Sequence, residues 1–141
     1  MEGTDLDVSL SHDRRVCICV AGQGLQGCDV EPIVQRTWSE WIGLLSNARE
    51  PILQQLIAST DTLARAGTRI WVVVEAVRKA INTGEIRLEI ASCKADAVLF
   101  NGIVGNQRLQ VLSFPLQLTR GPERMVASVM HSVNSLTILA Q

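Results

Sequence analysis

One segment, residues 68–82, constrains the fold of this 141-residue chain more than any other. It is apolar on almost every side. Its length, with Gly84 just beyond it, favours a helix over the strand that its run of valines alone would indicate. Because a helix without a polar face belongs inside a protein, we expect this one to be the central buried helix. Glu75 and Lys79 interrupt the apolar run, and their spacing of four places them on one helical face.

A second polar interruption lies nearer the N-terminus. Asp29 and Glu31 lie at the end of the predicted strand that begins at residue 25. Because they are alternate residues of a strand, their side chains point to the same side. If that strand packs on the helix, Asp29, Glu31 and Glu75 meet at one point. Three converging carboxylates repel one another unless a cation lies among them, and an all-oxygen ligand set suits Mg²⁺. The sequence therefore predicts a magnesium site made of these three acids.

Each polar pair also has a simpler interpretation. Asp29 and Glu31 could cap the turn before Pro32 and face water. Glu75 and Lys79 could form an ordinary ion pair on a helix surface, which contributes only about 0.3–0.5 kcal/mol. The surface pair fits this segment poorly, because so few of its other positions are polar.

Composition and charge limit the classes of protein to consider. Hydrophobic residues make up 47% of the chain and charged residues 19%, so we expect a single domain over 1–141 with a real core. The net charge is −1 and the basic residues are scattered along the sequence, so we expect no nucleic-acid partner. No apolar run reaches the ~20 residues of a membrane span, and the acidic N-terminus is unlike a signal peptide. We therefore expect a cytoplasmic protein with reduced cysteines: Cys17, Cys19, Cys28 and Cys93.

The N-terminal part of the chain predicts a small sheet followed by helices. Three apolar runs separated by turn residues indicate antiparallel strands: 8–10, 16–21 and 25–30. Thr37 and Glu40 form a capping box ahead of a helix over 38–46. Pro51 suits the first turn of a second helix, which Gly67 would end as a C-cap.

Beyond the central helix the pattern is mostly that of strands. Turn signals separate five apolar runs: 86–90, 97–100, 108–114, 116–118 and 125–130. The tail, residues 132–141, is mixed in character and we leave it unassigned. These elements together predict an α+β fold in which a small antiparallel sheet packs on the buried helix.

Three motifs occur in a fixed order along the chain. They are Ser-Leu-Ser-His at 9–12, Gly-Cys-Asp-Val-Glu at 27–31 and Trp-Val-Val-Val-Glu-Ala-Val-Arg-Lys-Ala at 71–80. Their order and separations resemble the 4′-phosphopantetheinyl transferase superfamily, in particular its surfactin-synthetase-activating type, over residues 7–81. The surroundings of Cys28 and the run 118–124 are similar to the C-terminal transferase domain of enediyne-type iterative polyketide synthases.

The resemblance implies a fold of the phosphopantetheinyl transferase type and a reaction. The enzyme would transfer 4′-phosphopantetheine from coenzyme A to a serine of an acyl carrier protein, a holo-ACP synthase activity of polyketide biosynthesis. Its partners would be coenzyme A and the acyl carrier protein, with no nucleic acid and no membrane. The chain would work as a homo-oligomer or as part of a larger polyketide synthase.

The resemblance also implies which residues bind the cofactors. Asp29, Glu31 and Glu75 would hold Mg²⁺ on the diphosphate of coenzyme A. Ser11 and His12 would bind phosphates of coenzyme A, with His12 donating a hydrogen bond or carrying charge.

Catalytic roles follow from the same correspondence. Glu75, directly or through a water, would take the proton from the serine hydroxyl of the carrier protein. Lys79 would bind the phosphates and neutralise or protonate the departing 3′,5′-ADP. Together with His12 these residues form the expected catalytic set, and Trp71 would pack under it.

Three departures from the family pattern leave a second hypothesis open. Val74 stands where the family usually has lysine, and Asp13 stands where it often has serine. Members of this type have two similar halves, and this chain resembles only the second half. The alternative is a degenerate, non-catalytic transferase-like module that docks carrier proteins or assembles oligomers. A hydrolase that uses the same acids on another phosphate ester has only the metal site in its favour.

Overall fold

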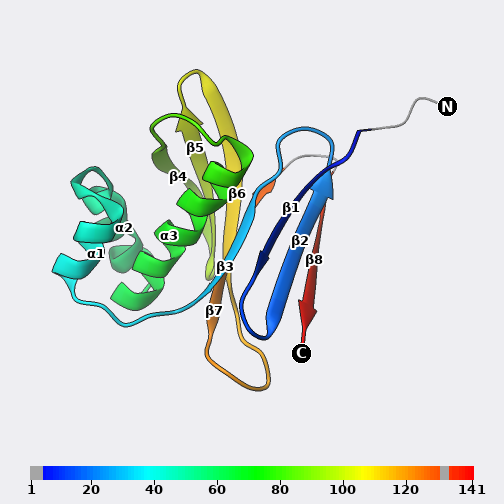
Figure 1. The fold of residues 1–141 in the computed structure, drawn as a ribbon. Coiled ribbons are helices and arrows are strands. Elements are labelled where there is room, and N and C mark those ends of the chain that lie inside the picture. The colour runs from blue at the N-terminus through cyan, green and yellow to red at the C-terminus, as the bar shows by residue number, and fades with distance from the viewer. Residues whose placement is uncertain (1–4, 131–133) are drawn as a thin grey trace.

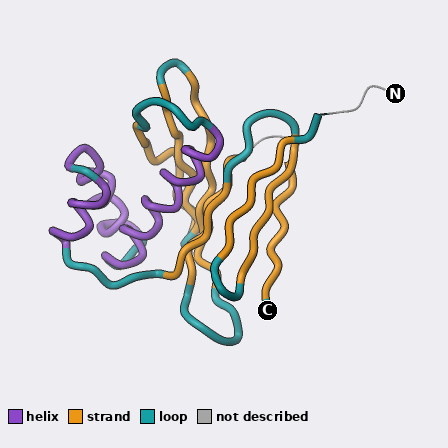
Figure 2. Tube along the Cα trace, viewed as in Figure 1, coloured by secondary structure: helices purple, strands orange, loops and turns teal. Residues whose placement is uncertain are grey.

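The computed structural model describes residues 5–130 and 134–141 and shows a mixed α+β fold, as predicted. It contains two antiparallel sheets and three α-helices within these ranges. The helices cover one face of the larger sheet, and the smaller sheet packs on the opposite face (Figures 1 and 2). No helix among the described residues is both long and apolar enough to cross a membrane.

The larger sheet has five strands, all of them antiparallel to their neighbours. Their spatial order is β3 (Cys28–Pro32), β7 (Arg124–Met130), β6 (Gln107–Leu116), β5 (Ala97–Val104) and β4 (Arg87–Lys94). The strand predicted over 108–114 is β6, which runs on through Pro115 to Leu116, and the prediction of a separate strand over 116–118 is wrong. Pro115 lies beyond Ser113, the last residue of β6 that pairs with β5.

The smaller sheet has three strands in the order β1 (Asp7–His12), β2 (Val16–Gly22) and β8 (Asn134–Ala140). The unassigned tail thus supplies β8, which pairs with β2. The prediction that residues 8–31 form one small sheet is wrong in part, because β3 pairs with β7 and not with β2. Serine hydroxyls of β1 hydrogen-bond to β3 along the edge of the larger sheet. Ser9 Oγ accepts from the Cys28 N–H and Ser11 Oγ accepts from the Val30 N–H, both at 3.2 Å.

The first two helices begin where the sequence predicts. Helix α1 (Trp38–Leu45) starts at a complete capping box between Thr37 and Glu40. After a short 3₁₀ turn, η1 (Asn47–Arg49), helix α2 (Glu50–Ser59) carries Pro51 in its first turn. Both start signals are confirmed.

The central helix α3 (Leu63–Ala80) begins five residues earlier than predicted, and the prediction that Gly67 ends the preceding helix is wrong. The Thr62 side chain caps α3 by accepting from the Arg65 N–H at 3.3 Å. Gly67 lies inside α3, where a Cβ atom would come within 2.3 Å of the Trp41 ring. Glycine is needed there because α1 and α3 pack so closely, and no chain reversal is involved.

The expectation that this helix is buried is confirmed. Its core face packs on the larger sheet through side chains that are at most 4% exposed: Ile70, Val72, Val73, Val74, Ala76 and Val77. A separate apolar cluster fills the space between the two sheets: Val16, Ile18, Val20, Cys28, Val30 and Val126. Strand β3 is therefore covered on both faces, by α3 on one side and by the smaller sheet on the other.

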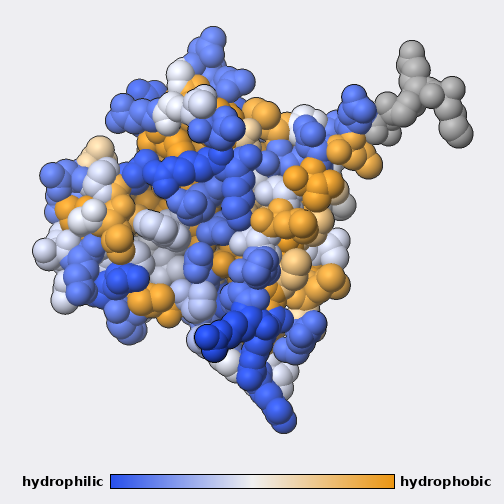
Figure 3. Space-filling model, in the orientation of Figure 1, coloured by the Kyte–Doolittle hydropathy of each residue, from blue (hydrophilic) through white to orange (hydrophobic). Residues whose placement is uncertain are grey.

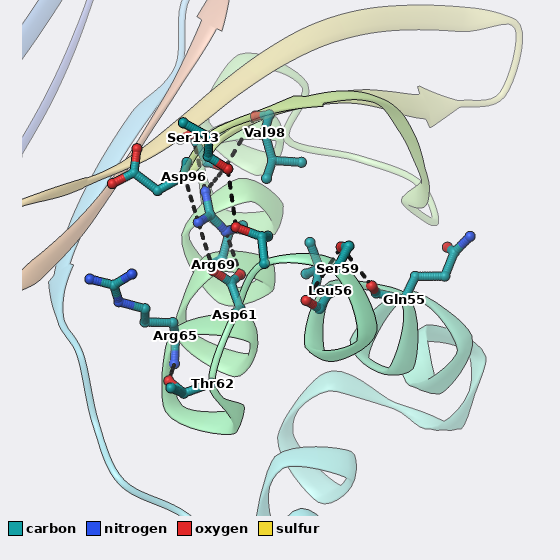
Figure 4. A network of polar contacts seen from close by, with 12 residues as sticks. Gln55, Leu56, Ser59, Asp61, Thr62, Arg65, Arg69, Asp96, Val98 and Ser113 are labelled. Atoms are coloured by element: carbon teal, nitrogen blue, oxygen red, sulfur yellow. Dashed lines mark hydrogen bonds and ion pairs between the residues drawn. The ribbon is translucent and has the colours of Figure 1, made fainter.

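A fully buried arginine fastens the start of α3 to the larger sheet (Figure 4). The Arg69 side chain is 0% exposed and donates twice to Asp61, at 2.7 and 2.9 Å. It also donates to the carbonyl and hydroxyl of Ser113 and to the Asp96 carbonyl, so all five guanidinium protons are used. The periodicity of the sequence gives no sign of this network, because Asp61 lies before the helix and Asp96 and Ser113 lie far along the chain.

Candidate functional site

The predicted site lies where β3 runs against α3. Cys28 and Val30 face the smaller sheet, so Asp29 and Glu31 point to the opposite side, toward the helix. A Cβ atom on Gly27 would lie 1.9 Å from the Ala76 carbonyl oxygen. This glycine lets the backbone of α3 approach the start of β3, and so places the second half of the helix beside the strand's acids.

Asp29 is the centre of the site. Its side chain is only 7% exposed. One carboxylate oxygen, Oδ1, accepts from Ser11 Oγ at 2.9 Å and from Lys79 Nζ at 3.3 Å. The other, Oδ2, is buried and has no hydrogen-bond partner among the described residues. A buried carboxylate oxygen without a donor is costly, so this atom marks a place for a cation or a proton.

The raised pKa values of the acids in the cluster also indicate a place for a cation or a proton. Burial raises the pKa of Asp29; its bonds to Ser11 and Lys79 only partly offset this, and the charge of Glu75 adds to the rise. Burial also raises the pKa of Glu31, and the negative charge of Asp29 raises it further. The three predicted acids are therefore close enough to repel one another.

Lys79 joins α3 to the two strands beside it. Its ammonium group donates to the Leu10 carbonyl at 3.2 Å, to the Cys28 carbonyl at 3.0 Å and to Asp29 Oδ1. These contacts use all three ammonium protons. In this arrangement Lys79 stabilises the cluster by bonding to β1 and β3 at once.

Of the three other predicted residues, Ser11 contacts Asp29, whereas Glu75 and His12 have other surroundings. Glu75 accepts from Arg78 at 2.7 Å through a side chain that is 28% exposed. His12 is exposed at the end of β1, whereas Ser11 is buried with its hydroxyl bonded to Asp29. The described part of the chain contains no group of three His, Cys, Asp or Glu side chains that could hold a metal as they now stand.

A small cavity of about 110 Å³ opens beside Glu31. The half-buried Trp71 lines it together with Trp41 and Leu44. Trp71 therefore lies next to one acid of the cluster, and the cavity walls around that acid are largely apolar and aromatic.

The two positions at which the sequence departs from the pattern it resembles have structural explanations. Val74 is 4% exposed and belongs to the core beneath α3, so a lysine at this position would bury its charge. Asp13 accepts from the buried Arg124, and its Oδ1 also accepts from the Arg15 and Val16 N–H groups. Its charge is thereby neutralised within the chain. Sequence reasoning missed Arg124, whose partner lies at the other end of the molecule's sequence.

Comparison of the chain with models of known protein families and with curated proteins gives no match.

Proposed function

We propose that the chain is a Mg²⁺-dependent 4′-phosphopantetheinyl transferase, or the domain of one, that modifies a serine of an acyl carrier protein. The observation that carries this proposal is the buried, unpartnered Oδ2 atom of Asp29, with Glu31 and Glu75 within electrostatic range. The ordered motifs that contain these residues supply the reaction class. The packing of β3 on a long buried helix is compatible with the transferase-type fold that those motifs imply.

The donor set fits a hard divalent cation. Asp29 and Glu31 would hold Mg²⁺ from one face of β3, and the ion would neutralise the diphosphate of coenzyme A. Glu75 would join them after leaving Arg78, a contact between partly exposed side chains worth about 0.3–0.5 kcal/mol. Loss of such a weak pair is a small cost against relief of the repulsion among the acids.

Glu75 is also the base of the proposed reaction. The serine hydroxyl attacks the β-phosphorus of coenzyme A, and its proton passes to the Glu75 carboxylate. The bond from that phosphorus to the bridging oxygen breaks, and 3′,5′-ADP leaves. Lys79 donates three hydrogen bonds within the cluster. These bonds fix the distance between α3 and β3, on which the alignment of the reacting groups depends.

Specific contacts favour the second candidate, a non-catalytic module of the same fold. All Lys79 protons are already used, the Ser11 hydroxyl is bonded to Asp29, and position 74 carries no cation. The buried Oδ2 atom of Asp29, which has no hydrogen-bond partner among the described residues, argues against this candidate, because a docking surface gains nothing from it.

Calorimetry separates the two candidates. The transferase predicts that coenzyme A binds to the intact chain only when Mg²⁺ is present, and that Asp29→Asn abolishes this binding. Glu89→Gln is the matched control, because Glu89 is an exposed acid on β4. Carrier-protein binding that needs neither Mg²⁺ nor coenzyme A, with no coenzyme A binding, would instead establish the module.

A further inference from the structure

Three arginines that are scattered in sequence gather at one end of the molecule. Arg14 and Arg15 form the turn between β1 and β2, and Arg120 lies in the loop between β6 and β7. All three side chains are exposed, and none has an acidic partner among residues 5–130 and 134–141. Strongly hydrophilic side chains cover this end of the molecule (Figure 3).

The two loops enclose a groove, which we call the arginine groove. It consists of two cavities, of about 590 and 690 Å³, and each of the three arginines lines both. Cavities of this size are typical of sites for small molecules. The walls also include apolar side chains, Leu118 in one cavity and Pro122 in the other.

The groove is held in shape by contacts that leave its arginines free. Asp13 bonds the backbone of its own turn and pairs with Arg124, which is 3% exposed, so the β1–β2 turn is fastened to β7. Glu123 pairs with Arg65 at 2.6 Å and fastens the opposite loop to α3. Asp13 in the groove and Glu123 in the adjoining loop are thus already paired, whereas the three exposed arginines have no acidic partner among the described residues.

We propose that the arginine groove binds a phosphate ester of small-molecule size. Guanidinium groups match phosphate oxygens with paired hydrogen bonds, and these are among the strongest hydrogen bonds in proteins. The arginines lie on both walls of a concave site, which favours a ligand that enters it over a flat acidic protein surface. The groove shares no residue with the acid cluster, so the proposal goes beyond the transferase function and does not depend on it.

The test is calorimetry on the intact chain without Mg²⁺, with inorganic phosphate and adenosine 5′-monophosphate as probes. We expect saturable binding of both probes, none of adenosine, and at least about a tenfold loss of affinity in the Arg14→Ala/Arg120→Ala double variant. Arg108→Ala is the matched control, because Arg108 is an exposed arginine of β6 away from the groove. Circular dichroism checks that each variant folds.

Three results would overturn the proposal. They are phosphate binding no tighter than adenosine binding, an equal loss of affinity in the control variant, and tighter binding of an oligoglutamate peptide than of either phosphate. The last result would make the groove a docking surface for an acidic protein. Because Mg²⁺ is absent, failure here is distinct from failure of the transferase proposal, which requires the metal.

Discussion

At the scale of single residues, Asp29 is the most informative position in the chain. Its sequence context predicted an acid facing α3, and the structure places it there with one oxygen unsatisfied. The sequence could not predict which neighbours bond to each oxygen of the Asp29 carboxylate. Ser11 of β1 and Lys79 of α3 both bond Oδ1, and no local sequence pattern encodes how these two elements lie around β3.

Protons should compete with Mg²⁺ at the proposed metal site. Because burial raises the pKa of both Asp29 and Glu31, protonation of the site begins at a higher pH than for ordinary carboxylates. Mg²⁺ affinity measured by calorimetry should therefore fall steadily as the pH is lowered from 7 toward about 4. An affinity that stays constant over this range would contradict the assignment of these two acids.

The same shift makes Asp29 a source of instability in the metal-free protein. An acid whose pKa is raised by folding lowers the free energy of unfolding as the pH rises above its unfolded value. Asp29→Asn should therefore increase the free energy of unfolding at pH 7. The gain should vanish by about pH 3, where the aspartate is largely protonated in both states. Urea unfolding at the two pH values checks this, and destabilisation at pH 7 would show that the ionised form is the stable one.

At the scale of elements, periodicity and capping predicted which segments are helical but not how they pack. The capping box of α1 and the apolar run of α3 are local signals, and both are confirmed. Gly67 was misread because a glycine after a helical run suggests an end, whereas its role depends on the Trp41 ring of another helix. Arg69 was missed for the same reason, since Asp61 lies outside its helix and Ser113 and Asp96 come from distant parts of the chain.

Glycine substitutions test the contact between α1 and α3. Gly67→Ala should lower the free energy of unfolding by about 1–3 kcal/mol, because its Cβ would overlap the Trp41 ring. Gly43→Ala is the matched control within α1, where a Cβ meets no atom within 4 Å. It should stabilise the fold by about 0.5–1 kcal/mol. Equal effects of the two changes in urea unfolding would disprove the close packing.

The buried network should matter far more than the exposed ion pair near it. Asp61→Asn leaves Arg69 buried without its counter-charge and should cost about 3–5 kcal/mol of unfolding free energy. Glu123→Gln removes a partner of Arg65 in a pair that is about 30% exposed, and should cost about 1 kcal/mol or less. Chemical denaturation of both variants checks the contrast. A cost for Asp61→Asn as small as that for Glu123→Gln would contradict the account.

At the scale of the whole molecule, function depends on what the fold brings together. Strand β3 lies between α3 and the smaller sheet, so its acids face a helix and remain partly screened from water. From the sequence, this meeting of strand and helix was the condition for the three acids to converge. The ordered motifs did not predict the arginine groove, because Arg14 and Arg120 look scattered until the two loops that carry them are fastened side by side.

The most direct test of the central claim is the mass of a carrier protein. We predict that the chain, incubated with an apo acyl carrier protein, coenzyme A and Mg²⁺, adds the mass of one phosphopantetheine group to the carrier. Glu75→Gln, which exchanges a part-exposed side chain and leaves the fold intact, should abolish this addition. No mass shift at high concentrations of the wild-type chain would contradict the transferase assignment, and a wild-type rate in Glu75→Gln would remove this residue from the mechanism.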